Sequence, residues 1–315
     1  MMKTTLTIMA LAVATTASAQ ENPLWLRHCA ISPDGSTVAF AYKGDIYTVP
    51  ATGGNARQLT TNSAHDSYPV WSPDSKQLAF CSNREGSMDV YVMNREGGAP
   101  RRLTTNSGTE TPIAFKDNNT VLYVSSIMPT AQSILFANGS LPQVYEVSTN
   151  ASRPRLFSAL PMMDISIRPN GDLLYHDQKG YEDPLRKHHR SPITRDIWLR
   201  RAGKYTKLTN FNGEDRTPVW AAQGDSFYYL SEEDGTFNVY KRNIDGTDKQ
   251  QLTRHTTNPV RFLTAATDGT LCYGYDGEIY TLKQGAQPQK LKVNIVTDKT
   301  DKDLDRQTLF TGATE

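Results

Sequence analysis

Short apolar or alternating runs recur along the chain, and turn-forming residues separate them. The clearest copy comprises four such runs, at residues 70–74, 77–80, 89–93 and 101–104. Runs of this length with period-two alternation are typical of β-strands, and Gly, Asn and Asp residues between such runs favour tight hairpins. Each copy therefore predicts four antiparallel strands that form one small sheet.

Six copies of this pattern follow one another at intervals of roughly 40 to 50 residues, the length that a four-stranded blade requires. The residues aligned with Pro73 in the other copies are Pro33, Lys116, Pro169, Ala222 and Thr267. One sheet cannot bury both of its faces alone, so the repetition favours blades packed around a ring over an open β-solenoid. The predicted fold is all-β, a six-bladed β-propeller of four-stranded antiparallel blades, and we assign it to residues 20–296.

The ends of the repeat region bear on how the ring closes. All six copies carry their four strands in order, so no strand is left over at either end. We therefore expect closure by packing between blades one and six alone, without a strand from one terminus completing the blade of the other.

The three cysteines, Cys29, Cys81 and Cys272, all fall on predicted strands. Cysteine at such positions is most often a small buried apolar residue. A Cys29–Cys272 bridge across the seam between blades one and six is the less favoured alternative, because sequence alone does not show the geometry that a disulfide needs.

The N-terminus has the pattern of a secretory signal peptide. Lys3 precedes an apolar stretch of small residues, and an Ala17-Ser18-Ala19 cleavage site follows it. We expect residues 1–19 to be removed after Ala19, which predicts an exported protein, periplasmic or extracellular. No later apolar run is long enough to cross a bilayer, so we expect no membrane span.

The C-terminal residues depart from the repeat. Residues 297–306 are rich in charge and are typical of a linker. Residues 307–315 then begin another strand-like run, at which the sequence stops. We interpret this run as the start of a following, truncated domain, because connections normally lead to another element. A C-terminal tail is the alternative.

Composition and motifs limit the chemistry that the chain can carry. Lys and Arg number 34 against 33 Asp and Glu, which argues against nucleic acid as a partner because nucleic-acid-binding proteins show a basic excess. The sequence has no G-x-S-x-G, H-E-x-x-H or phosphate-binding loop, and no C-x-x-C pair. We therefore expect no catalytic residues, no metal site and no cofactor in this chain.

Two blades carry long insertions between their second and third strands, at residues 126–142 and 178–195. Strand direction alternates within a blade, so both insertions lie on the same face of the disc, where binding often resides. The second insertion is locally basic, and its candidate peptide-binding residues are Arg186, Lys187, His188 and Arg190. A solvated basic loop, or one that pairs with a neighbouring subunit, is the alternative.

Several segments resemble a known family. Ser-Pro-Asp-Gly at 32–35, Leu-Ala-Phe at 78–80 and Asp-Ile-Tyr at 45–47 resemble the repeats of TolB-like, WD-like and tricorn-type propellers. More specifically, residues 179–189 and 194–198 resemble the fourth blade of the first propeller in exported, tricorn-like serine peptidases. The opening at residues 23–35 resembles the same proteins, so the likeness covers essentially the whole mature chain.

This resemblance implies a non-catalytic propeller that precedes a second propeller, a PDZ-like module and a serine peptidase core. None of those later modules is in this chain, so no catalytic residue is carried over. The implied role is to filter or guide peptide substrates of a proteolytic enzyme and to aid its assembly. The implied partners are peptides or proteins and the C-terminal modules of the same polypeptide, with a homo-oligomer left open.

Two other interpretations remain. The chain can be a stand-alone periplasmic binding scaffold similar to TolB, or the propeller of a prolyl-oligopeptidase-type hydrolase. Sequence beyond residue 315 separates all three, since a stop codon, a second propeller and a G-x-S-x-G motif each favour a different one.

Overall fold

The protein was analysed as a computed structural model that describes residues 23–126, 141–180 and 191–296. Within these ranges the regular elements are strands, and no helix is present that could span a membrane. The predicted signal peptide at 1–19, the linker at 297–306 and the run at 307–315 lie outside the described residues.

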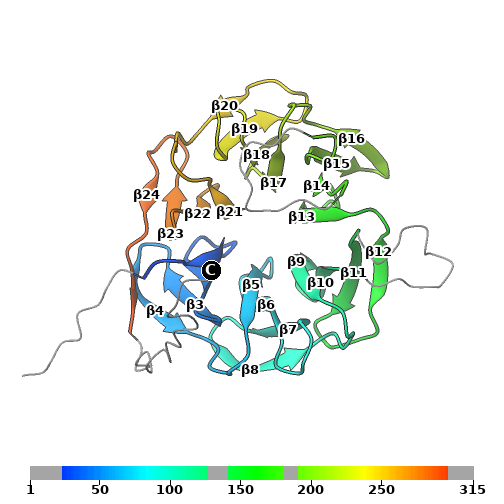
Figure 1. Cartoon of the computed structure of the whole chain (residues 1–315), viewed down its shortest axis with the longest axis vertical. Helices are drawn as coiled ribbons and strands as arrows, with labels where there is room; N and C mark the ends of the chain where they lie inside the picture. The colour runs from blue at the N-terminus through cyan, green and yellow to red at the C-terminus, as the bar shows by residue number, and fades with distance from the viewer. Residues whose placement is uncertain (1–22, 127–140, 181–190, 297–315) are drawn as a thin grey trace, which may run out of the picture.

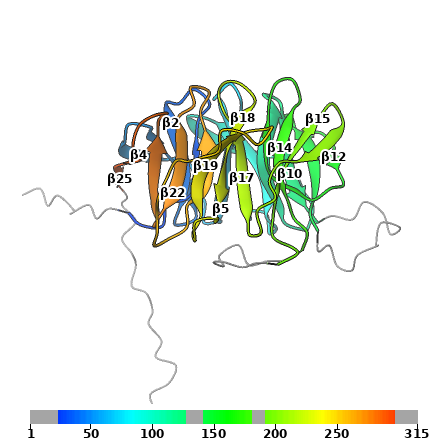
Figure 2. The ribbon, with the colours of Figure 1, turned by 90° about the horizontal axis from the view of Figure 1, so that it is seen from above.

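The strands form six four-stranded antiparallel blades arranged in a ring (Figure 1), and a channel runs through its centre. In each blade the first strand is innermost, because residues of that strand line the channel. Viewed from the edge, the blades form a thick disc (Figure 2). The predicted fold is confirmed.

Blades one to three contain the following strands in chain order: β1 (Arg27–Ile31), β2 (Thr37–Tyr42), β3 (Asp45–Pro50), β4 (Gly54–Gln58), β5 (Asp66–Trp71), β6 (Gln77–Ser82), β7 (Asp89–Asn94), β8 (Gly97–Arg102), β9 (Glu110–Asp117), β10 (Thr120–Ser125), β11 (Gln143–Ser148) and β12 (Arg155–Ser158). Blades four to six contain β13 (Met162–Ile167), β14 (Leu173–Asp177), β15 (Ile197–Arg201), β16 (Lys204–Lys207), β17 (Asp215–Trp220), β18 (Ser226–Ser231), β19 (Asn238–Asn243), β20 (Gln250–Gln251), β21 (Arg261–Ala265), β22 (Leu271–Tyr275), β23 (Glu278–Leu282) and β24 (Gln289–Lys290).

Apolar side chains pack between neighbouring blades. Among the described residues, each of the six seams between blades holds its own cluster of buried apolar residues. At the seam between blades one and two, Ile46 and Ala39 of one blade pack with Leu78 and Phe80 of the next, and all four are fully buried. Burying both faces of every blade is the main stabilisation that the ring provides.

The Ser-Pro-Asp-Gly turn of blade one is built by its own side chains. Ser32 Oγ donates to Asp34 Oδ1 at 2.5 Å, and the same carboxylate oxygen accepts the Ser36 backbone N–H at 3.0 Å. Gly35 has φ of +72°, a conformation that favours glycine. These contacts explain why this phrase marks the hairpin between the first two strands.

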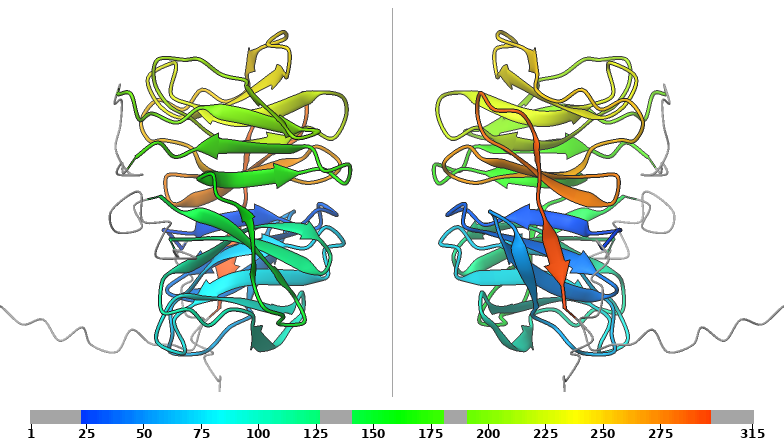
Figure 3. Two further views of the ribbon diagram at one scale, coloured as in Figure 1. Left: turned by 90° about the vertical axis from the view of Figure 1, so that its right-hand side faces the viewer. Right: turned by 90° about the vertical axis from the view of Figure 1, so that its left-hand side faces the viewer.

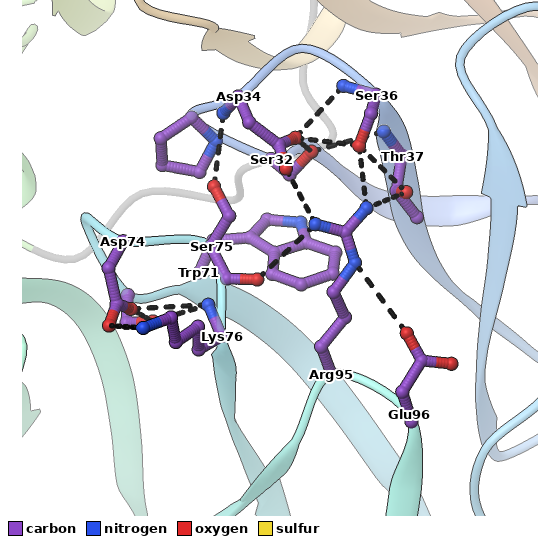
Figure 4. A network of polar contacts seen from close by, with 12 residues as sticks. Ser32, Asp34, Ser36, Thr37, Trp71, Asp74, Ser75, Lys76, Arg95 and Glu96 are labelled. Carbon is purple, nitrogen blue, oxygen red and sulfur yellow. Dashed lines mark hydrogen bonds and ion pairs between the residues drawn. The ribbon is translucent and has the colours of Figure 1, made fainter.

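The same turn also joins blade one to blade two (Figure 4). Arg95 of blade two binds Asp34 Oδ2 at 2.6 Å and donates to Ser36 Oγ and Thr37 Oγ1, both at 2.5 Å. Its guanidinium lies 5.6 Å from the ring centre of Trp71, whose indole N–H donates to Ala30 O at 2.9 Å. The repeat motif therefore supports packing between blades as well as its own turn.

Closure of the ring differs from the sequence prediction. A further strand, β25 (Val293–Ile295), pairs in parallel with β4 at the outer edge of blade one. Figure 3 shows this strand crossing from blade six to blade one. In the opposite direction, Leu26 N donates to Gly277 O of blade six at 2.9 Å. The expectation that no strand completes the ring was wrong, because three residues are too short to show a strand pattern.

Pairing in blade three corrects the repeat alignment by one residue. Phe115 pairs with Val121 as Trp71 pairs with Leu78, so the counterpart of Pro73 is Asp117 rather than Lys116. An additional register shift near the turn of this blade causes the difference.

Candidate functional site

The central channel is the main cavity that the six blades create. It has a volume of about 860 Å³, and residues from all six innermost strands line it. Its charged lining residues include Arg168, Arg195, Arg216, Arg261 and Asp164. A channel of this size between rigid blades is a natural place for an extended ligand.

A β-bulge interrupts every innermost strand near its N-terminal end. In five blades the bulge holds a non-glycine residue with φ between +47° and +57°. In blade three the equivalent residue is Pro112, whose ring prevents a positive φ. All six residues line the channel, and we call them the bulge ring: His28, Tyr68, Pro112, Asp164, Thr217 and Phe262.

The positive φ values are costly for residues other than glycine, particularly for a β-branched residue such as Thr217. Bulges re-aim side chains, and here they re-aim one residue of each blade at the channel. The repetition of one strained conformation in five blades makes the bulge ring the leading candidate for a functional surface.

One side of the bulge ring is aromatic. His28 stacks on Tyr68 with ring centres 3.8 Å apart and meets Phe262 edge-on at 4.9 Å. Burial, followed by the nearby charge of Arg27, lowers the pKa of His28 to about 4, so this imidazole is neutral at physiological pH. Burial also raises the pKa of Tyr68, and the Asp164 carboxylate of blade four adds to that shift.

The other side of the bulge ring is polar. Thr217 Oγ1 donates to Asp164 Oδ2 at 2.7 Å, and the Thr217 backbone N–H donates to His176 Nδ1 at 3.3 Å. Burial raises the pKa of Asp164. Burial, followed by the charges of Arg195 and Arg216, holds the pKa of His176 well below its usual range.

Asp164, His176 and Thr217 are the residue types of a catalytic triad, but their hydrogen bonds do not match one. The Thr217 hydroxyl donates to the carboxylate and not to the imidazole, while His176 Nδ1 accepts from a backbone N–H. Nucleophilic catalysis needs the hydroxyl beside the base. This cluster therefore positions polar groups in the channel and does not activate a nucleophile.

A buried carboxylate joins two arginines of the channel wall. Arg195 Nη1 lies 2.6 Å from Glu214 Oε1, and Arg216 Nε binds the same oxygen. Burial acts to raise the pKa of Glu214, but hydrogen bonds and charges from Arg216 and Arg195 bring it below its usual range. The ion pair between Arg195 and Glu214 holds the last residue of the blade-four insertion against blade five.

The candidate peptide-binding residues Arg186, Lys187, His188 and Arg190 lie outside the described residues. The described ends of their insertion are anchored. Lys179 Nζ lies 2.5 Å from Asp196 Oδ2, and Arg195 is held by Glu214. Because Asp177 pairs with Met162 at the start of β13, the insertion leaves blade four at the end where the bulge ring lies.

Sequence reasoning missed the bulge ring. Its members share no residue type, so no recurring letter marks them. The usable signal was positional, since all six residues stand five places before the counterpart of Pro73, once the counterpart in blade three is corrected to Asp117. His28 of β1 and His176 of β14 both line the channel.

Together, the blades, the channel and the polar and aromatic ring define a channel-forming propeller domain. Residues 23–288 match the family model described as "Tricorn protease N-terminal beta propeller domain". The chain belongs to this family, as the sequence resemblance implied.

Relatives agree with this assignment. "Tricorn protease homolog 1" of Streptomyces coelicolor is 28% identical over 277 residues, which are 85% of this chain and 25% of the relative. The chain thus spans about a quarter of the length of that relative. The crystal structure of the tricorn protease superposes with a TM-score of 0.74 at 20% identity, covering 89% of this chain and 27% of that one. TolB from Acinetobacter baumannii superposes at 0.61 and 14% identity, covering 84% of this chain and 68% of that one, which shows the fold alone.

Proposed function

We propose that this chain is the non-catalytic propeller of a longer tricorn-like serine peptidase, and that it guides or filters peptide substrates. The carrying observation is the channel, whose bulge ring presents one re-aimed side chain from each blade. Membership of the tricorn propeller family and the partial coverage of its relative support the same proposal. An unfolded peptide fits a channel of mixed aromatic and polar lining because its backbone needs hydrogen bonds and its side chains need apolar contact.

The blade-four insertion is the proposed recruitment element. Arg186, Lys187, His188 and Arg190 draw the terminal carboxylate of a peptide towards the channel, since guanidinium groups bind carboxylates in a bidentate manner. The anchoring of Arg195 at the channel wall supports this role, because the insertion ends beside the channel. A structural or subunit-pairing role for the loop is the alternative outcome.

A cleavage assay on the full-length protein tests the proposal. Arg186, Lys187 and Arg190 are replaced together by Ala, and rates are compared for peptides with free and amidated C-termini. We expect the free peptides to slow more than the amidated ones, most clearly at low salt where charge attraction is least screened. Equal effects on both substrates would leave the insertion with a structural role only.

A matched control removes the same number of charges from exposed positions elsewhere. Lys76, Arg101 and Lys204 are exposed, and none of them lines the channel. Their joint replacement by Ala leaves the ratio of free to amidated rates unchanged if the effect belongs to the insertion.

The proposal includes export. The N-terminal pattern at residues 1–19 supports cleavage after Ala19, and residues 297–315 support a linker that leads to a further domain. Intact-mass measurement of the exported protein tests the first point, and a retained Met1 contradicts it. Sequence downstream of Glu315 tests the second, where a nearby stop codon favours the TolB-like scaffold instead.

A further inference from the structure

The seam between blades six and one brings the two ends of the repeat region together and closes the ring. Ile31 N donates to Thr264 Oγ1 at 3.0 Å, and Thr267 N donates to Pro33 O at 2.9 Å. The parallel pairing of β25 with β4 adds a third connection. These described contacts are non-covalent and join segments more than 230 residues apart in the chain.

Two cysteine thiols meet at this seam. Thr264, which accepts the Ile31 hydrogen bond, is the cross-strand partner of Cys272, and Cys29 lies two residues before Ile31. Both cysteines belong to the same buried apolar cluster, with exposed fractions of 2% for Cys29 and 0% for Cys272. The hydrogen bond that the Cys272 thiol makes with Cys29, followed by burial, raises the pKa of Cys272 well above its usual value.

Cys81 provides an internal comparison. It is equally buried but lies in blade two, where its sulfur is 3.2 Å from Ser67 Oγ. Burial raises the pKa of Cys81 to about 11. Cys81 is not a member of the buried cluster that contains Cys29 and Cys272. Its cross-strand partner is Ser67.

We propose that Cys29 and Cys272 are a cross-linking site, which forms a disulfide and locks blade six to blade one when the chain folds in the presence of a small-molecule disulfide. The thiolate of one cysteine attacks the oxidant, breaks its S–S bond and releases one thiolate. The second cysteine thiolate then attacks the mixed disulfide, forms the Cys29–Cys272 bond and releases the other thiolate. Two protein thiols lose two electrons and two protons, and one disulfide is reduced to two thiols.

The burial of both sulfurs restricts thiol–disulfide exchange to the time before the ring closes. In the closed ring both sulfurs are buried, and the Cys272 thiolate is disfavoured, so exchange is slow. Contacts between distant parts of a chain are entropically costly and form late in folding. The thiols therefore meet the oxidant before the seam closes, and the closed seam afterwards protects the bond from reductants.

Refolding of the full chain tests this inference. The protein is unfolded in urea and refolded with a mixture of oxidised and reduced glutathione, or with a reductant alone. We expect a disulfide-linked peptide pair containing Cys29 and Cys272, with Cys81 alone free to react with an alkylating agent after denaturation. We also expect the Tm of the oxidised protein to rise by about 5–10 °C, because the bridge closes a very long loop.

Alanine variants distinguish the roles of Cys29 and Cys272 from that of Cys81. Cys81→Ala keeps the linked peptides and the rise in Tm, whereas Cys29→Ala and Cys272→Ala each lose both. Circular dichroism of each variant under reducing conditions shows whether it has folded like the reduced wild type. Three free thiols in the oxidised wild type, a link that includes Cys81, or an unchanged Tm would overturn the proposal. None of these outcomes tests the proposed peptide-guiding role, because that role needs no disulfide.

Discussion

At the scale of single residues, two buried carboxyl groups at the seam between blades two and three stand out. Asp89 and Glu110 are 0% and 1% exposed and hydrogen-bond each other. Burial, aided by Asp89, raises the pKa of Glu110 to about 7. Arg102 binds Asp89 at 2.7 Å, while Thr104 hydrogen-bonds Glu110 and Tyr123 lies beside it. Glu110 is therefore protonated below about pH 7, in a range where an ordinary glutamate is ionised.

This arrangement predicts a specific pH dependence of stability. The pKa of Glu110 is higher in the folded state than in the unfolded chain, so the folded state binds more protons between roughly pH 4.5 and 7. Stability from this group is complete below that window and is lost as pH rises through it, by about 3 kcal/mol. Glu110→Gln should therefore flatten the fall in the free energy of unfolding between pH 5 and pH 8, as measured by urea denaturation.

A control for this prediction replaces an exposed acid. Glu96 has an exposed side chain, so Glu96→Gln should keep the pH dependence of the wild type. An identical pH dependence in the wild type and Glu110→Gln would show that Glu110 is ionised in the folded protein.

At the scale of elements, the pairing of β25 with β4 depends on a glycine turn in blade one. We call this pairing the latch. Gly53 has φ of +85°, and a Cβ at this position would lie 2.7 Å from the carbonyl oxygen of Lys292. The Gly54 N–H donates to that same oxygen at 2.8 Å. The close approach of the two backbones is what lets the chain enter β25 beside β4.

We predict that Gly53→Ala weakens this latch. Gly97 occupies the corresponding turn of blade two with φ of +83°, and a Cβ there would meet its nearest atom at 3.6 Å. Both substitutions carry the cost of a positive φ, but only Gly53→Ala also displaces Lys292. Chemical denaturation should show that Gly53→Ala lowers the free energy of unfolding by about 1–2 kcal/mol more than Gly97→Ala. Equal losses would mean that β25 does not stabilise the ring.

The elements also show what the sequence can and cannot predict. Strands of five or six residues with flanking turns carry enough alternation to be recognised, so the six blades followed from their pattern. β25 has only three residues, and its partner is more than 230 residues away, so no local pattern reveals it. The bulge ring depends on backbone register, which the unlike residues His28, Asp164 and Phe262 do not encode as a shared letter. The peptide-binding role of the basic residues at 186–190 stays a prediction, because these residues lie outside the described ranges.

At the scale of the whole molecule, the ring brings the innermost strands of all six blades to one central channel. The chain belongs to the tricorn N-terminal propeller family and spans about a quarter of the length of its relative, and aromatic and polar side chains line its channel. The imidazoles that line the channel, His28 and His176, have pKa values held below the usual range by burial. Near neutral pH a neutral imidazole acts as a general base only where a hydroxyl, thiol or water whose proton it can accept lies within hydrogen-bond reach.

We predict that purified residues 20–315 cleave neither peptides nor esters. The Thr217 hydroxyl donates a hydrogen bond to Asp164, and the Thr217 backbone N–H donates one to His176 Nδ1. Activation of that hydroxyl would require both hydrogen bonds to break. The measurement is turnover of unstructured peptides and activated esters by repurified protein, with and without a serine-reactive inhibitor, alongside Thr217→Val as a variant that lacks the hydroxyl. Activity that persists through repurification and disappears in Thr217→Val would place a catalytic site in the channel.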